Sequence, residues 1–316
     1  MIITLTPNPS LDRTIALDTL QRGGVHRALS LREDPGGKGV NVSRALAANG
    51  TATIAVLPAG GAMAAQFSSL LDDARVPHTL IDLAGAVRTN ITLVEEDGTT
   101  TKINERGRLS TAADATLMLE AVEAQLTGAS WVVGCGSLPP GLDGSLYREL
   151  VERARARGVK IAIDTSGDAL GDAIAARPDL VKPNHHELGE YVGHPLRQLS
   201  DVLAASRDVV NSGVETVVVS LGSHGAVAVT ADGAEHAVSR GTIPLSTVGA
   251  GDCLLAGWLD AVSAGADPRA AIAQAVRWGS AAVELPGSSV PGPRDIAHVT
   301  VDTSTAPLPS LSMTSD

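Results

Sequence analysis

The chain has 316 residues, 44% of them hydrophobic and 19% charged, which is enough to bury a sizeable core in one large domain. A formal net charge of −11 and few aromatic residues (3 Trp, 2 Tyr and 1 Phe) argue against nucleic acid as a partner, because it would require clustered Lys and Arg or stacking platforms. Two cysteines, and no apolar stretch of membrane-spanning length, predict a protein of the reducing cytoplasm without a membrane partner.

The N-terminal region mixes strand signals with turns. Residues 2–6 predict an opening strand and residues 9–13 the loop after it, whereas residues 13–35 are short, alternating and rich in turns. Farther along, residues 89–94 and 99–104 have strand-like patterns that are joined by an Asp-Gly hairpin signal. These pieces predict a small antiparallel sheet beside the main body.

Most of the remaining chain alternates between apolar, β-branched runs and helical patterns. This alternation predicts an α/β domain with a parallel sheet flanked by helices, and with ligands at the carboxyl ends of the strands. The expected strands cover residues 52–57, 79–83, 131–133, 160–164, 180–182 and 216–220, and a further hairpin begins at residues 226–230. Because the composition then becomes rich in Ser, Thr and Pro, we expect one domain over residues 1–302 and a disordered tail over residues 303–316.

One glycine-rich turn, Gly249-Ala250-Gly251-Asp252, stands where a loop enters an apolar helix. The first N–H groups of such a helix lack partners within the helix, so they attract an anion or stabilise charge that develops in a reaction. The acid can also simply favour the helix dipole. A second signal is needed to choose between these interpretations.

That signal is a second glycine cluster, Pro35-Gly36-Gly37-Lys38-Gly39, which opens a helix that closes at Asn49-Gly50. Two glycine-gated helix starts predict two polar ligands, or one ligand held from both sides. The common nucleotide motifs compete poorly. The P-loop pattern is absent because Lys38 is followed by Gly39, and the late glycine turn lacks the third glycine of a dinucleotide fingerprint.

With both motifs, the chain resembles the ribokinase-like carbohydrate kinases of the PfkB family over residues 1–300. Within that family it is similar to 1-phosphofructokinases and tagatose-6-phosphate kinases. The resemblance implies a Rossmann-type sheet and a β lid, formed by residues 13–35 and 88–106, that covers the sugar and holds a homodimer together. It also implies ATP and Mg²⁺ as cofactors.

The resemblance assigns catalytic and sugar-binding roles to residues of both motifs. It implies that Asp252 takes the proton from the acceptor hydroxyl, while the backbone of Gly249, Ala250 and Gly251 forms an anion hole for the transferring phosphoryl group. The implied sugar-side ligands are Asp12, Gly36, Gly37 and Asn41 for hydroxyls, and Arg27, Lys38, Arg88 and Ser137 for the existing phosphate or the ring. For the three basic side chains, the alternative is solvated surface charge.

The resemblance also assigns the nucleotide side. The implied ATP ligands are Lys182, Asn184, Ser220, Gly222, Gly225 and Gly279. Glu187 and Asn184 form the family's Asn-x-x-Glu motif, which is linked to Mg²⁺, and we expect them to act through the water shell because Mg²⁺ releases its waters reluctantly.

The expected function is the ATP-dependent phosphorylation of a ketohexose monophosphate, with fructose 1-phosphate as the acceptor and fructose 1,6-bisphosphate as the product. Tagatose 6-phosphate and fructose 6-phosphate stay open as acceptors, because pocket geometry decides between them. An alternative of another class is a non-catalytic sugar-phosphate sensor, against which the intact Asp252, Asn184 and Glu187 argue. A nicotinamide-dependent oxidoreductase is a third possibility.

Overall fold

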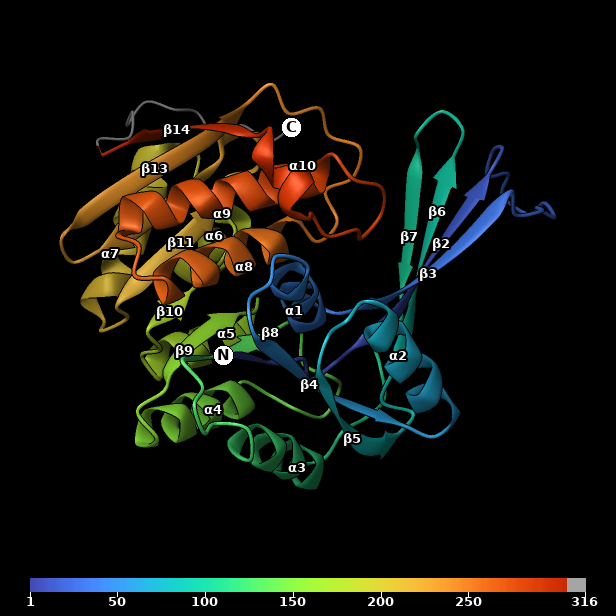
Figure 1. Ribbon diagram of the computed structural model, residues 1–316, viewed down its shortest axis with the longest axis horizontal. Helices are drawn as coiled ribbons and strands as arrows, with labels where there is room; N and C mark the ends of the chain where they lie inside the picture. Colours follow the sequence, from blue (N-terminus) through green and yellow to red (C-terminus); the bar gives the residue numbers. More distant parts are fainter. Residues whose placement is uncertain (306–316) are drawn as a thin grey trace.

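The computed structural model describes residues 1–305, which form a ten-stranded sheet and a separate four-stranded sheet (Figure 1). Across the large sheet the strand order is β14 (Thr300–Ser304), β13 (Gly233–Arg240), β12 (Ala226–Thr230), β11 (Thr216–Ser220), β10 (Leu180–Val181), β9 (Lys160–Asp164), β8 (Trp131–Cys135), β1 (Ile2–Leu5), β4 (Thr53–Gly60) and β5 (His78–Ala84). The strands from β11 to β5 run parallel, and the three others are antiparallel. The predicted parallel sheet is confirmed.

The parallel strands are buried on both faces, which explains their continuous apolar sequences. In β11, Val217 and Val219 belong to the core on one face of the sheet, and Val218 belongs to the core on the other. The side chains of successive strand residues point to opposite faces, so a run of β-branched residues fills both layers.

Helices cover both faces of the large sheet. The first layer contains α1 (Lys38–Ala48), α2 (Ala62–Asp73), α8 (Ala250–Ser263), α9 (Pro268–Val283) and α10 (Pro293–Ala297). The second contains α3 (Ala112–Glu123), α4 (Ser145–Ala156), α5 (Asp168–Ala175), α6 (His185–Val192) and α7 (Leu199–Asn211), and the short turn η1 (Gly222–His224) joins β11 to β12. Over residues 1–305, no helix has both the length and the apolar character to cross a bilayer. The cytoplasmic location stays a prediction.

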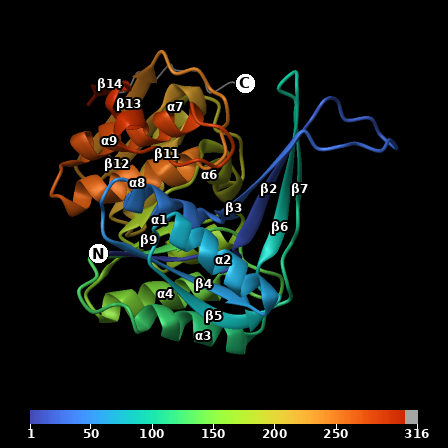
Figure 2. The same ribbon diagram turned by 45° about the vertical axis from the view of Figure 1, so that its right-hand side comes forward.

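The smaller sheet, called the lid sheet below, stands away from the main body (Figures 1 and 2). Its strand order is β3 (Ser30–Gly36), β2 (Ser10–Leu17), β6 (Arg88–Glu95) and β7 (Thr100–Asn104). The outer pairs are antiparallel as expected, but the central pair, β2 and β6, is parallel. The central pair is parallel because the chain passes through α1, β4, α2 and β5 between the two halves of the sheet, and such a crossover brings strands back in parallel.

Two predicted boundaries are wrong. Ser10 to Arg13, expected within a loop, belong to β2, because pairing with β3 on one side and β6 on the other overrides the local turn signal. Thr303 and Ser304, expected in a disordered tail, extend β14 and pair with Ala237 and His236 of β13. The remaining tail residues, 306–316, lie outside the described part of the chain.

Candidate active site

The two helices that begin at the glycine clusters, α1 and α8, start beside each other near the carboxyl ends of the parallel strands. Gly37 caps α1 with φ 112° and Gly249 caps α8 with φ 76°, backbone conformations that favour glycine. Asn41 and Asp252 are 211 residues apart in the sequence, yet Asn41 Nδ2 donates a hydrogen bond of 2.9 Å to Asp252 Oδ2. The acid of one predicted motif therefore contacts the amide of the other, and one ligand can bridge both.

Two lysines and a buried acid lie at the carboxyl ends of the strands. Lys38 Nζ lies 2.8 Å from Asp164 Oδ1, and Lys182 Nζ lies 3.1 Å from Asp164 Oδ2. Burial alone would raise the pKa of Asp164, but the two ammonium groups outweigh it and hold that pKa below its usual value. The acid is thus an ionised anchor that fixes both lysines in place.

Asp252 has the opposite electrostatic setting. Its side chain is buried, and burial raises its pKa to about 6, with a further upward contribution from Asp164. Lys38, Asn41 and Lys182 oppose this rise but do not cancel it. A carboxylate whose pKa lies just below neutral is mostly ionised at pH 7 and is a stronger base than an ordinary aspartate. This setting suits proton abstraction from a hydroxyl group.

The uncapped amino end of α8 lies beside this carboxyl group. The Ala250 N–H lies 3.5 Å from the Thr247 carbonyl oxygen, whereas the N–H groups of Gly251 and Asp252 have no partner within residues 1–305 and remain available to a ligand. A Cβ atom added to Gly251 would lie 3.5 Å from Lys182 Nζ, which places a buried ammonium group against the same turn. Backbone dipoles and a positive charge therefore converge where Asp252 also points.

Asp12 and Gly36 meet at the base of the lid sheet. A Cβ atom at Gly36 would lie 2.2 Å from Asp12 Oδ2, so only glycine allows this approach. Asp12 Oδ1 accepts hydrogen bonds from Ser10 Oγ at 2.7 Å and Asn90 Nδ2 at 3.0 Å. Asn90 Oδ1 is buried and has no hydrogen-bond partner within residues 1–305. The cluster therefore offers a carboxylate and a free amide oxygen to polyol hydroxyls.

Arg44 links the lid side to the base. This buried side chain donates from Nη1 to Asn41 Oδ1 at 3.2 Å and to the carbonyl oxygens of Pro35 at 3.3 Å and Ser288 at 3.1 Å. Because the Asn41 oxygen accepts from Arg44, its amide nitrogen is the atom that faces Asp252. Arg44 is thus a positioning residue.

Three of the predicted sugar-phosphate ligands have different settings. Arg88, half-buried in β6, donates from Nη1 to the carbonyl oxygen of Glu105 at 2.7 Å and lies opposite Ser10, close to the Asp12 cluster. Ser137 is exposed in the loop after β8. Arg27 lies in the exposed connection between β2 and β3, which forms the outer tip of the lid (Figure 2), and the structure does not bring it to the other site residues.

On the nucleotide side, Asn184 and Glu187 form a capping box at the start of α6. The backbone N–H of Glu187 donates to Asn184 Oδ1, and the backbone N–H of Asn184 donates to Glu187 Oε2, both at 2.8 Å. Glu187 Oε1 faces Lys38 Nζ at 3.6 Å. Asn184 also bridges to Ser220 at the end of β11. The predicted nucleotide residues thus adjoin the lysine pair.

Comparisons with known proteins agree with this geometry. The profile of the pfkB family carbohydrate kinases matches residues 6–295. The chain belongs to the pfkB family. It is 39% identical to a 1-phosphofructokinase of Rhodobacter capsulatus over 97% of this chain and 98% of that protein. The predicted family, the fold class and the class of activity, an ATP-dependent sugar-phosphate kinase, are confirmed.

Solved structures of pfkB-family kinases match the fold closely. Phosphofructokinase-2 from Escherichia coli in complex with substrates and products superposes with a TM-score of 0.86, at 33% identity, over 94% of this chain and 97% of that chain. A tetrameric inhibited form of that enzyme superposes with a TM-score of 0.84, at 33% identity, over 94% and 96% of the two chains.

Two glycines predicted to adjoin ATP have packing roles in this pfkB-family chain. A Cβ atom at Gly225 would lie 1.9 Å from the carbonyl oxygen of Ala237, so this glycine lets η1 lie against β13. Gly279 is buried, and a Cβ atom there would lie 3.2 Å from both the Ala250 carbonyl oxygen and Leu254 Cβ. Gly279 therefore allows α9 to pack against the first turns of α8, and its contact with ATP stays a prediction. Gly222, with φ 61°, simply forms the turn itself.

The sequence analysis missed Asp164, Arg44 and Asn90. For Asp164 a signal was present, since an acid directly ends an apolar parallel strand, where α/β folds place ligands. Arg44 stands in a helix whose residues from Gly39 to Leu46 are all buried, where a charged side chain is unusual. Asn90 carried no comparable signal, because its role depends on the register between β2 and β6.

Proposed function

We propose that this kinase transfers the γ-phosphoryl group of ATP to the 6-hydroxyl of fructose 1-phosphate, forming fructose 1,6-bisphosphate and ADP. The observation that carries the proposal is the contact of Asn41 with Asp252 beside the uncapped start of α8, with the Asp12 cluster on the lid side. The 1-phosphofructokinase of Rhodobacter capsulatus supports this choice of acceptor.

In the proposed mechanism Asp252 accepts the proton of the attacking hydroxyl. The sugar oxygen forms a bond to the γ-phosphorus while the bond from that phosphorus to the ADP oxygen breaks, so ADP leaves with the electron pair. Negative charge on the transferring oxygens faces the N–H groups of Gly249 to Gly251 and the Lys182 ammonium group. Such preorganised donors stabilise the transition state without reorganising during the reaction.

The lid side orients the acceptor. Asp12 and the free Asn90 oxygen accept hydrogen bonds from sugar hydroxyls, and the glycine at position 36 lets the sugar approach the backbone. Arg88 is the cation for the existing phosphate, since it lies beside the Asp12 cluster and uses Nε and Nη1 for backbone carbonyls. Its position fixes the distance between the phosphate and the reacting hydroxyl.

The residues present fit Mg²⁺ through its water shell. Among residues 1–305, no group of three or more His, Cys, Asp or Glu side chains could hold a metal directly. Asn184 Oδ1 is engaged in the capping box, whereas Glu187 Oε1 faces only Lys38. We therefore assign Glu187 to the water shell of the ion, which would neutralise phosphate charge when it is bound with the nucleotide.

We propose that a second copy of the chain covers the lid sheet. Leu31 on β3 and Ile103 on β7 are 53% and 54% exposed, and Val25 and Leu29 in the lid tip are 94% and 58% exposed. Apolar side chains gathered on a projecting sheet are typical of an interface. In light scattering, a Leu31→Lys and Ile103→Lys double variant should have the mass of a monomer. Leu117→Lys, at a position on α3 that is 45% exposed, is the control and should keep the wild-type mass.

A coupled ADP-release assay tests the substrate. We expect the highest kcat/KM with fructose 1-phosphate, compared with tagatose 6-phosphate and fructose 6-phosphate at the same ATP and Mg²⁺ concentrations. A higher kcat/KM with either competitor would replace the proposed acceptor. Binding of all three without ADP release would favour a sensor and reject the kinase mechanism.

A further inference from the structure

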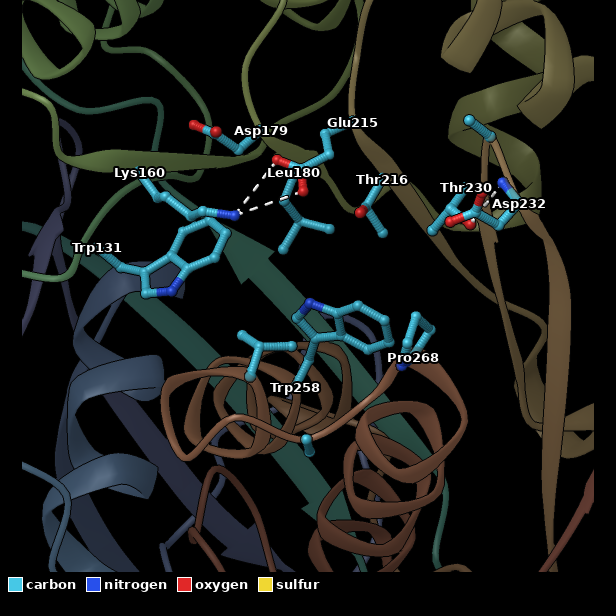
Figure 3. Close-up of a pocket in the computed structure, with 13 residues that line it drawn as sticks. Trp131, Lys160, Asp179, Leu180, Glu215, Thr216, Thr230, Asp232, Trp258 and Pro268 are labelled. Carbon is cyan, nitrogen blue, oxygen red and sulfur yellow. Dashed lines mark hydrogen bonds and ion pairs between the residues drawn. The ribbon is translucent and has the colours of Figure 1, made fainter.

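A pocket lies at the amino ends of the central strands of the large sheet, at the opposite ends of these strands from the active site (Figure 3). Its walls come from the amino ends of β8, β9, β10 and β11, from the carboxyl half of α8 and from the start of α9. The active site, in contrast, lies at the carboxyl ends of these parallel strands. The cavity has a volume of about 360 Å³, enough for a ligand of one or two rings.

The inner wall of this pocket is aromatic and apolar. Trp131 and Trp258 line it together with Leu180 and Val262. Trp258 is only 3% exposed, and its ring nitrogen forms no hydrogen bond within residues 1–305. In Figure 3 this nitrogen lies on the side of the ring that faces Leu180 and Thr216 across the cavity. Because the indole N–H lies at the wall of the cavity, it is a donor that a ligand inside the cavity can reach.

The rim of the pocket is predominantly acidic. Asp179, Glu215 and Asp232 face it with three carboxylates, against the single ammonium group of Lys160. Lys160 Nζ lies 3.4 Å from both Glu215 oxygens and 5.6 Å from the centre of the Trp131 ring. One Asp179 oxygen accepts from the Ile161 amide, and both Glu215 oxygens face Lys160, so the Asp232 carboxylate is the most available of the three. This charge balance repels phosphates and favours a cation.

We propose that the pocket binds a small, planar organic cation that carries a hydrogen-bond acceptor. Its ring covers the indole faces, which attract cations as the Lys160 position already illustrates. Its acceptor takes the Trp258 N–H, and its charge faces Glu215 and Asp232. The site is separate from the kinase site, although α8 contributes to both, with Asp252 in its first turn and Trp258 farther along.

Three molecules with the same ring separate the contributions. N1-methylnicotinamide is a cation with a carbonyl acceptor, nicotinamide is its neutral counterpart, and nicotinate is an anion. Titration calorimetry on the full-length chain should give the tightest binding for the cation and the weakest for the anion. Intrinsic fluorescence is a second readout, since Trp131 and Trp258 line the pocket and Trp278 does not. Saturating AMP-PNP should leave the affinity unchanged.

Variants test the assigned residues. Glu215→Gln combined with Asp232→Asn should weaken binding of the cation about fivefold and leave neutral nicotinamide unaffected, because exposed charge pairs contribute modestly. Trp258→Phe keeps the ring but removes the donor, and should weaken binding of both carbonyl-bearing molecules. Asp73→Asn, an exposed acid on α2, is the control. Three results would each overturn the proposal: nicotinate binding as tightly as the cation, displacement of the cation by AMP-PNP, or no binding of the cation. The Glu215→Gln and Asp232→Asn double variant tests the proposal even if Trp258→Phe fails to fold.

Discussion

Replacing Asp252 with Asn should lower kcat and raise the stability of the folded protein. The substitution keeps the size of the side chain and an oxygen that can accept from Asn41, but removes the base. Loss of a positioned general base lowers kcat by roughly 10²- to 10⁴-fold. Binding of the sugar phosphate and of ATP should persist, because their assigned ligands are unchanged.

The stability effect follows from the raised pKa of Asp252. The pKa is about 6 in the folded protein against an ordinary value of 3.8, so ionisation of this buried carboxyl opposes folding. The wild type therefore loses stability as the pH rises between these two values, and Asn avoids this loss. Asp252→Asn should be more stable than the wild type by about 1.5 kcal/mol at pH 5 and about 3 kcal/mol at pH 7.5.

Urea unfolding at several pH values measures this difference, with Asp73→Asn as the control because that exposed acid has no hydrogen-bond or ion-pair partner within residues 1–305. A variant that is less stable than the wild type at pH 7.5, or a difference that does not change with pH, would refute the assignment of a buried carboxylate with a raised pKa. An unchanged kcat would refute its role as the base.

Three further substitutions test the neighbouring residues. In the wild type, kcat should rise with pH around a midpoint near 6, the pKa of Asp252. Lys182→Met removes a charge that lowers this pKa, so the midpoint should move to higher pH. An unmoved midpoint would contradict the coupling between Lys182 and Asp252. Gly36→Ala places a methyl group on the Asp12 carboxylate and should raise KM for the sugar phosphate about tenfold or more without changing KM for ATP, and equal changes in both would count against a sugar-specific contact. Arg44→Met releases the amide that faces the base; kcat should fall while KM for ATP stays constant, and wild-type kinetics in a folded variant would remove its positioning role.

The sequence predicted those parts of the molecule that depend on local patterns. Apolar β-branched runs indicated the parallel strands, and the two glycine clusters indicated the helix starts around Gly37 and Gly249. What the sequence did not reveal depends on pairing between distant segments. The parallel contact of β2 with β6, and the pairing of Thr303 with Ala237, exist only once the chain has folded back on itself.

The same distinction applies to the site. Motifs located Asp252, Asn41 and Lys38, because their backbone setting is encoded in nearby glycines. Packing decided the others. Gly279 lets α9 pack against α8, and the two lysines on the Asp164 carboxylate come from other elements, so neither arrangement follows from a local pattern.

The contact between Asn41 and Asp252 joins an early segment of the chain to a late one. During synthesis the ribosome completes β2, β3 and α1 well before it reaches Asp252, the base of the proposed mechanism. A prematurely terminated product that lacks α8 would have neither that base nor the backbone N–H groups beside it, so the proposed transfer requires the late part of the chain as well as the early one.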